Sequence, residues 1–278
     1  MKIKILALAT IMALCLSGVA FAGSVEVKGS TTVLPLMQKC AEAFMAANKG
    51  VNVSISGGGS SEGIKALIDG TCDIAMASRD IKDKEAEAAT ANGRAPKLFL
   101  VAYDCIVPIV HPGNKVKNLT VTQLQDIYAG KITDWKDLGG DAGQIVVISR
   151  DTSSGTYDCW ENKVMHANDK KERVFPGALL QASNGAVVQA VSKNKLAIGY
   201  IGLGYLTDAV KAIPVVGEDG KPVIPAVDTV KAGSYPISRP LFMYTKQDPS
   251  SQVAEFLTWI MGDEGQKIVA DEGFVPVK

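Results

Sequence analysis

Three short segments rich in glycine and hydroxyl-bearing residues could bind a small ligand: 29–32 (Gly-Ser-Thr-Thr), 57–61 (Gly-Gly-Gly-Ser-Ser) and 150–156 (Arg-Asp-Thr-Ser-Ser-Gly-Thr). Each follows a strand-like apolar run and precedes a helical pattern. The first N–H groups of a helix lack partners within the helix and carry partial positive charge, and Ser and Thr hydroxyls add donors. One such turn alone is typical of an ordinary N-cap. Three together indicate a site for a compact oxyanion.

Two arginines could add charge-assisted hydrogen bonds to the same site. Arg150 and Arg79 each follow a predicted core strand, and a guanidinium can donate two parallel hydrogen bonds to one oxyanion. Each arginine also has a structural alternative. Arg150 could pair with Asp151 or another acid, and Arg79 could pair with Asp80, so the sequence leaves both roles open.

A catalytic interpretation has less support. Segment 59–63 matches the G-x-S-x-G pattern of a nucleophilic serine, here Ser61. That pattern needs an acid and then a histidine downstream, but the chain has 2 histidines, His111 in a predicted turn and His166 near a predicted helix end. We therefore expect no enzyme and keep an exported serine hydrolase as the weaker alternative. The sequence has no P-loop, no dinucleotide-binding glycine pattern and no zinc-type spacing, so we expect no cofactor and no metal.

The elements that must position these residues follow a regular order. Short β-rich runs alternate with helical patterns, which predicts an α/β protein with mainly parallel sheets. Ligands of such sheets bind at the carboxyl ends of the strands, where the three turns would lie. The run 97–110 is too long for an ordinary strand, and 236–245 is a second extended run. We predict that both cross between two lobes, with the ligand in the cleft between them.

Length and composition are those of a globular protein that could form one large or two smaller domains. The chain has 278 residues, of which 47% are hydrophobic and 21% charged. Lys plus Arg and Asp plus Glu both number 29. This balance argues against nucleic-acid binding, because a protein that neutralises many phosphates needs a basic excess.

Residues 1–22 have the three regions of a secretory signal peptide: a basic start, an apolar run over 5–16 and a small-x-small site ending at Ala22. We expect cleavage after Ala22 and a periplasmic mature protein. Cys15 could instead carry a lipid anchor, although Leu14 stands before it where a lipidation signal needs a small residue.

Four of the 5 cysteines follow that cleavage site, an even number in an oxidising compartment: Cys40, Cys72, Cys105 and Cys159. Four cysteines allow three pairings. Because Cys40 and Cys72 belong to one early α/β unit and Cys105 and Cys159 to the next, we predict those two disulfides. The alternative is that some of these cysteines are buried as small apolar residues.

Read in order, the turns and their flanking segments resemble the phosphate-binding proteins of the phosphate ABC transporter, the PstS family. The similarity extends over nearly the whole mature chain. It rests on seven motifs: 29–35 (GSTTVLP), 57–61 (GGGSS), 73–79 (DIAMASR), 127–138 (IYAGKITDWKDL), 149–156 (SRDTSSGT), 199–202 (GYIG) and 235–240 (YPISRP). The resemblance implies a type II periplasmic-binding-protein fold, α/β with two lobes joined by two crossing strands. We expect lobe I at 23–104 and 240–278, and lobe II at 105–239.

In that family, as the resemblance implies, dehydrated phosphate lies between the lobes. Carried over by motif, the binding residues would be Thr31, Thr32, Ser60, Arg150, Ser154, Gly155 and Thr156. Ser78 and Arg79 are expected at the site as well. Arg79, preceded by Ser78, stands where some members have an aspartate that accepts the proton of phosphate. An arginine there would attract any anion without selecting phosphate over sulfate. The acceptor could then be Glu62, Asp151 or a backbone carbonyl.

The resemblance thus implies an exported solute-binding protein, expected to be monomeric. It would capture inorganic phosphate between its lobes and deliver it to a membrane ABC permease. Within the same class, the alternatives are binding proteins for sulfate, molybdate or tungstate.

Overall fold

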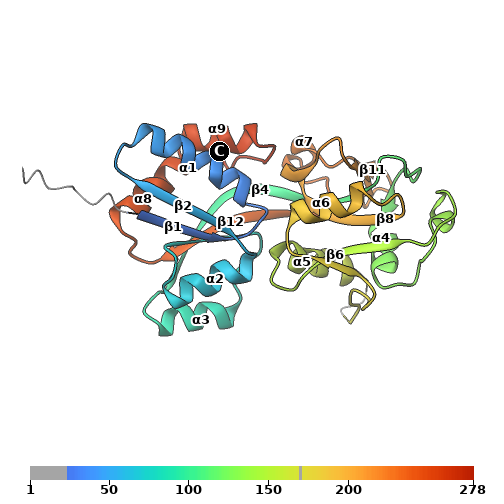
Figure 1. Ribbon diagram of the computed structural model, residues 1–278, viewed down its shortest axis with the longest axis horizontal. Helices are drawn as coiled ribbons and strands as arrows, with labels where there is room; N and C mark the ends of the chain where they lie inside the picture. The colour runs from blue at the N-terminus through green and yellow to red at the C-terminus, as the bar shows by residue number, and fades with distance from the viewer. Residues whose placement is uncertain (1–23, 169–170) are drawn as a thin grey trace, which may run out of the picture.

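The computed structural model describes residues 24–168 and 171–278 and has two α/β lobes side by side (Figure 1). The predicted signal peptide and its Cys15 lie outside the described residues. Strands β4 (Pro96–Val110) and β12 (Ser238–Lys246) are antiparallel neighbours that run from one lobe into the other. The predicted two-lobed α/β fold with two crossing strands is therefore confirmed.

One lobe combines the first part of the described chain with its last two helices. Its elements are β1 (Ser24–Gly29), α1 (Leu34–Ala47), β2 (Asn52–Gly57), α2 (Ser60–Asp69), β3 (Ile74–Ala77), α3 (Asp83–Ala91), α8 (Ser251–Ile260) and α9 (Asp263–Asp271). Here β1 pairs in parallel with β2 and with β3, and β12 pairs antiparallel with β3. Parallel pairing of β1 with β2 brings the ends of these two strands to one edge, where two of the candidate turns begin.

The other lobe contains the middle of the chain. Its larger elements are α4 (Val121–Tyr128), β6 (Val146–Arg150), α5 (Gly155–Trp160), β7 (Leu179–Gln181), α6 (Asn184–Ser192), β8 (Ala197–Gly202) and α7 (Val227–Lys231). Its shorter elements are β5 (Leu119–Thr120), β9 (Lys211–Ala212), β10 (Val215–Val216), β11 (Pro222–Val223), the 3₁₀ helices η1 (Trp135–Leu138) and η3 (Leu203–Tyr205), and the π-helix η2 (Glu161–Met165).

One continuous sheet connects the two lobes, in the strand order β2-β1-β3-β12-β4-β8-β6-β7, with β9 also paired to β4. A smaller sheet has the order β11-β10-β5. The predicted lobe boundaries, after residues 104 and 239, fall inside the two crossing strands, and their exact positions stay a prediction.

Apolar spacing explains the helices next to the candidate turns. Helix α1 has Pro35 in its first turn and buries Leu36, Cys40 and Phe44, which follow one another at four-residue steps along one face. Helix α2 ends at Gly70, whose φ of 75° is a left-handed conformation that favours glycine. The helices are thus fixed against the sheet, and their N-terminal turns are held at its edge.

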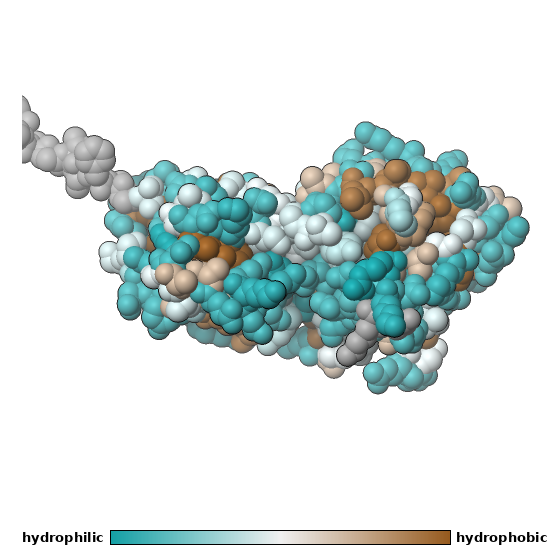
Figure 2. Space-filling view, turned by 90° about the horizontal axis from the view of Figure 1, so that it is seen from below, coloured by the Kyte–Doolittle hydropathy of each residue, from teal (hydrophilic) through white to brown (hydrophobic). Residues whose placement is uncertain are grey.

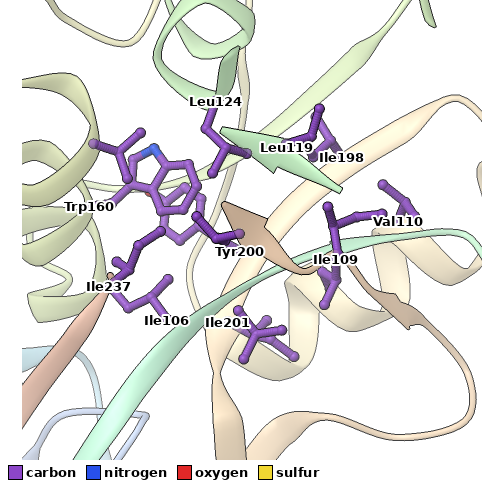
Figure 3. Packing of buried hydrophobic residues seen from close by; sticks show 14 of the residues in the cluster. Ile106, Ile109, Val110, Leu119, Leu124, Trp160, Ile198, Tyr200, Ile201 and Ile237 are labelled. Carbon is purple, nitrogen blue, oxygen red and sulfur yellow. The ribbon is translucent and has the colours of Figure 1, made fainter. Parts of the chain in front are cut away.

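The core of the second lobe supports the turn after β6. Trp160 stacks on Tyr200, with ring centroids 4.3 Å apart and ring planes at 5° (Figure 3). The Tyr200 hydroxyl accepts a hydrogen bond from the Arg150 backbone N–H at 3.2 Å and lies 3.0 Å from Ser149 Oγ. A fully buried tyrosine therefore holds the end of β6 in place.

The two predicted disulfides are wrong for this structure, in which all four described cysteines are free and buried. Cys40 lies on α1 and Cys72 lies just before β3, in separate hydrophobic clusters. Helices α1 and α2 cover opposite faces of the sheet (Figure 1), and Cys72 Sγ contacts Gly63 O of α2 at 3.8 Å. Cys105 on β4 and Cys159 on α5 share one core cluster but stay unbonded. Here all four cysteines are small apolar core residues.

Candidate ligand-binding site between the lobes

The three predicted turns converge where the lobes meet. Thr32, between β1 and α1, lies with its Oγ1 3.0 Å from Thr156 Oγ1 in the first turn of α5. The Ser61 backbone N–H of α2 donates to Ser153 O, across the lobes, at 3.1 Å. The structure therefore brings both turns of one lobe against the Arg150–Thr156 turn of the other, as predicted.

Two glycines make this close approach sterically feasible. A Cβ atom at Gly155 would lie 2.2 Å from Ser60 Oγ and 2.6 Å from Ser78 Oγ. Gly59 has a φ of 115°, and a Cβ there would lie 2.8 Å from Ser153 O. Larger residues at these two positions would hold the lobes apart.

Buried serines line the side of the cluster that belongs to the first lobe. Ser60 Oγ accepts a hydrogen bond from the Ser78 backbone N–H at 3.0 Å, and Ser30 Oγ donates to Ser78 Oγ at 3.0 Å. Ser60 and Ser78 are both at most 1% exposed. The structure thus places the predicted site residues Ser60 and Ser78 together, and with them Ser30, which a one-residue shift in the match of the first turn would also have put at the site.

Ser154 is the N-cap of α5. Its Oγ accepts hydrogen bonds from the backbone N–H groups of Thr156 at 3.1 Å and Tyr157 at 3.3 Å. The hydroxyl oxygen therefore stabilises the helix start, while its single proton can still be donated to a ligand.

Arg150 is the most strongly buried cation of the cluster, with 1% of its surface exposed. Its Nε donates to Gln181 O at 2.9 Å and its Nη2 to Ala182 O at 3.0 Å, whereas Nη1 is buried without a hydrogen-bond partner among the described residues. Burial lowers the pKa of Arg150, because a positive charge is costly away from water. Neutral carbonyls hold this side chain, and its charge remains available to an anion.

Arg79, by contrast, is engaged in a structural ion pair. Its guanidinium donates to both carboxylate oxygens of Glu85, at 2.7 and 2.8 Å, and to Ser61 Oγ at 3.0 Å. It also reaches the backbone oxygen of Asp80, at 2.8 Å, rather than the predicted carboxylate. Arg79 therefore contacts the second candidate turn through Ser61, and its charge is paired with Glu85.

The two carboxylates predicted as alternative proton acceptors each have a local structural role, and their part in proton recognition stays a prediction. Glu62 lies in the first turn of α2, where an acid is favoured by the helix dipole. Asp151 Oδ1 accepts a hydrogen bond from the Ser153 backbone N–H at 2.9 Å and a second from its hydroxyl.

The sequence analysis missed a second buried arginine and the residues around it. Arg239 Nη2 lies 2.8 Å from Asp104 Oδ2 and donates to Thr32 Oγ1 at 3.1 Å. Asn184 Nδ2 donates to the same Thr32 oxygen at 3.1 Å, and the Tyr205 hydroxyl donates to Thr31 O. Asp104, the one acid in the largely apolar run 97–110, was the available signal for the ion pair.

A groove of about 620 Å³ opens beside the cluster. Ser78 and Arg239 line it, together with Lys82 of the first lobe and Asp158 of the second. Lys82 Nζ and Asp158 Oδ1 form an ion pair 2.9 Å long that spans the two lobes. The surface where the lobes meet is mainly hydrophilic (Figure 2).

The geometry gives no support to a serine hydrolase. Ser61 Oγ accepts a hydrogen bond from Arg79, whereas His111 accepts one from the Gly113 N–H and His166 contacts Arg173. Neither histidine contacts the serine that the motif singled out. Within 24–168 and 171–278, no group of three or more His, Cys, Asp or Glu residues could hold a metal ion. The helices of the same ranges are all too short or too polar to cross a membrane.

A two-lobed fold with a buried, positively charged polar cluster at the lobe junction defines a solute-binding protein. The sequence matches the PBP superfamily domain over residues 20–264. It is 35% identical to the phosphate-binding protein PstS of Staphylococcus epidermidis over 262 residues, which cover 91% of this chain and 78% of the relative. The PstS of Staphylococcus saprophyticus is 36% identical, with 91% and 80% covered.

Solved structures that resemble this chain are also of phosphate-transport proteins. One is described as a candidate phosphate ABC transporter substrate-binding protein from Clostridium perfringens with bound phosphate. It has 38% sequence identity and a TM-score of 0.84, and covers 92% of this chain and 100% of its own. An ABC-type phosphate transport receptor from Vibrio cholerae has 32% identity and a TM-score of 0.71, with 90% and 99% covered. The chain belongs to the PstS family of phosphate-binding proteins.

Proposed function

We propose that this protein captures inorganic phosphate between its two lobes and performs no chemical step on it. The observation that carries the proposal is Arg150: a buried guanidinium that is held by two neutral carbonyls and has one nitrogen without a partner among the described residues. Buried charges are normally paired, so an anionic ligand would complete this site. The names of the relatives, which are phosphate-binding proteins, supply the identity of that anion.

The hydroxyl groups around Arg150 suit a dehydrated oxyanion. Thr31, Thr32, Ser60, Ser154 and Thr156 each carry a proton that can be donated, and all are at most 7% exposed. Hydrogen bonds to a charged group contribute roughly 1.5–3 kcal/mol each. Several of them together reach the approximately −8 kcal/mol that corresponds to micromolar affinity after ordering costs are met.

The transport role follows from the class of protein. We infer that the chain is exported, acts as a monomer and hands phosphate to a membrane ABC permease. The Clostridium perfringens and Vibrio cholerae neighbours, described as ABC transporter proteins, support this assignment. A phosphate-uptake assay in cells that lack the chain, with and without re-expression, tests it. Unchanged uptake on deletion would contradict the transport role.

The variant Arg150→Ala tests the position of the site. Removing the guanidinium should weaken phosphate binding about tenfold or more, because at least one charge-assisted hydrogen bond is lost. Titration calorimetry measures the affinity and thermal unfolding of the ligand-free protein checks the fold. A folded Arg150→Ala protein with unchanged phosphate affinity would show that the site lies elsewhere.

A further inference from the structure

Arg239 and Asp104 form a buried ion pair in the two strands that cross between the lobes. They are directly opposite each other in the register of β12 and β4, and their side chains are 3% and 0% exposed. Arg239 Nε and Nη2 lie 3.1 and 2.8 Å from Asp104 Oδ2. Asp104 Oδ1 accepts a further hydrogen bond from the Leu203 N–H at 3.0 Å. The guanidinium is thereby fixed in one position.

The Arg239 guanidinium also contacts two predicted site residues, Thr32 and, through a longer hydrogen bond from Nη1 at 3.5 Å, the backbone oxygen of Gly155. Arg239 Nη2 donates to Thr32 Oγ1 at 3.1 Å, and Asn184 Nδ2 donates to the same oxygen at 3.1 Å. The amide of Asn184 has a defined orientation, because its Oδ1 accepts a hydrogen bond from the Gly202 N–H at 3.1 Å. Both groups that face Thr32 Oγ1 are therefore donors.

The number of hydrogen bonds that Thr32 Oγ1 can form determines where the hydroxyl protons of Thr32 and Thr156 point. A threonine hydroxyl can accept two hydrogen bonds and donate one. Arg239 and Asn184 occupy both acceptor positions of Thr32 Oγ1, so its own proton must be donated. The neighbouring oxygen is Thr156 Oγ1 at 3.0 Å. Thr156 accepts that proton, and its own proton is then available to another acceptor.

We propose that the Asp104–Arg239 ion pair and Asn184 are positioning residues: they direct the hydroxyl proton of Thr32 to Thr156, whose own proton is then available to the bound anion. They need not touch the anion themselves. Donors that are oriented before binding avoid the cost of reorganising at the moment of binding. This inference rests on the proposed function, since it assigns these residues a role at the same phosphate site.

A pair replacement tests the inference without changing net charge. In the double variant Asp104→Leu with Arg239→Met, apolar residues of similar volume replace the buried ion pair, which proteins often tolerate. We expect inorganic phosphate to bind about tenfold or more weakly to this variant, by calorimetry. The matched control is Glu85→Leu with Arg79→Met, which removes the ion pair outside the cluster and should change affinity by less than about twofold. Equal effects of the two replacements would overturn the inference.

Making the same pair replacement in a Thr32→Val protein distinguishes an effect on hydroxyl orientation from a general structural effect. In the Thr32→Val background the hydroxyl that would be oriented is absent. Replacing the Asp104–Arg239 pair there should weaken binding by less than about twofold more, because the shorter contact of Arg239 with the cluster is to the missing hydroxyl and its other contact, to Gly155 O, is 3.5 Å long. A further loss of about tenfold or more in that background would show that the pair acts by another route.

Asn184→Leu provides an independent variant should the pair replacement fail to fold. It should weaken phosphate binding about tenfold in the natural sequence and less than about twofold in a Thr31→Val, Thr32→Val background, because Asn184 Nδ2 donates to the hydroxyls of both threonines, at 3.2 and 3.1 Å. A loss of the same size in both backgrounds would overturn the inference. If the unmodified protein bound no phosphate, the proposed function itself would fail, which is a distinct outcome.

Discussion

Arg150 and Arg79 each follow a core strand, yet their guanidinium groups have different surroundings. Arg150 contacts two backbone carbonyls and keeps one nitrogen without a partner among the described residues, whereas Arg79 is paired with Glu85. From sequence the two looked alike, because a strand-end arginine is compatible with either role. Glu85, six residues after Arg79 and in the first turn of α3, was a local signal for the ion pair.

The ion pair of Arg79 predicts a specific pH dependence of stability. Burial alone would raise the pKa of Glu85, but the hydrogen bonds from Arg79 and the Lys82 N–H, with their charges, lower it below its ordinary 4.5. The unfolded chain therefore takes up a proton at higher pH than the folded one. The stabilisation by ionised Glu85 is fully present above about pH 4.5 and is lost as the pH falls through the lower folded value.

The variant Glu85→Gln checks this dependence. It should reduce the free energy of unfolding by about 2 kcal/mol at neutral pH, since Arg79 is buried and loses its charged partner. Urea denaturation at about pH 7 and about pH 3 should show that the difference from the natural protein shrinks in acid. Phosphate affinity should change by less than about twofold. A stability difference independent of pH would contradict the assignment.

The variant Gly155→Ala tests whether the absence of a side chain at this position is needed for the lobes to close. In Gly155→Ala, the added methyl group would lie 2.2 Å from Ser60 Oγ in the closed arrangement, so the lobes could not close fully. Phosphate affinity should fall about tenfold or more, as measured by calorimetry. Gly185→Ala is the control, because a Cβ there meets no atom closer than 3.9 Å. Similar losses in both variants would show that closure against Ser60 is not the cause.

At the scale of elements, local patterns predicted the three turns correctly. Each turn consists of consecutive residues, so it can be recognised in the sequence. The parallel strands then place the turns at one edge of the sheet. The disulfides were predicted wrongly because proximity along the chain does not reveal which face of a sheet a residue occupies. Cys40 lies on the buried face of α1, whereas Cys72 packs against α2, and these helices cover opposite faces of the sheet (Figure 1).

The burial of the cysteines predicts how their thiols react in the folded and in the denatured protein. Burial raises the pKa of the thiols of Cys40 and Cys72 to about 12, and thiols at neutral pH react through their thiolates. Folded protein without residues 1–22 should not react with Ellman's reagent, whereas the same protein in denaturant, without reductant, should release four equivalents, one for each described cysteine. Fewer equivalents in denaturant would show that disulfides form.

At the scale of the whole molecule, the sequence did not reveal contacts between distant segments. Arg239 and Asp104 are 135 positions apart, and Asn184 is 152 positions from Thr32. No local pattern links such residues. They meet because two crossing strands and the α6 helix come together at the lobe junction, so only the folded chain shows that Thr32 has contacts from both lobes.

The ion pair between Lys82 and Asp158 should stabilise the closed molecule modestly. Lys82 is largely exposed, and such pairs contribute about 0.2–1 kcal/mol. Lys82→Gln should therefore weaken phosphate binding by less than about fivefold and mainly accelerate dissociation. Stopped-flow measurements compare it with Lys84→Gln, which removes the same charge from an exposed position on the same helix. A larger effect at Lys84 would contradict this role for the pair.

The most direct test is calorimetric titration of the unmodified protein, unfolded and refolded to remove any carried-over ligand, with phosphate and then with sulfate. We predict one phosphate per chain, with micromolar or tighter affinity, about −8 kcal/mol or more favourable, and weaker binding of sulfate. Comparable binding of both anions, or binding of sulfate alone, would contradict the assignment of phosphate as the ligand.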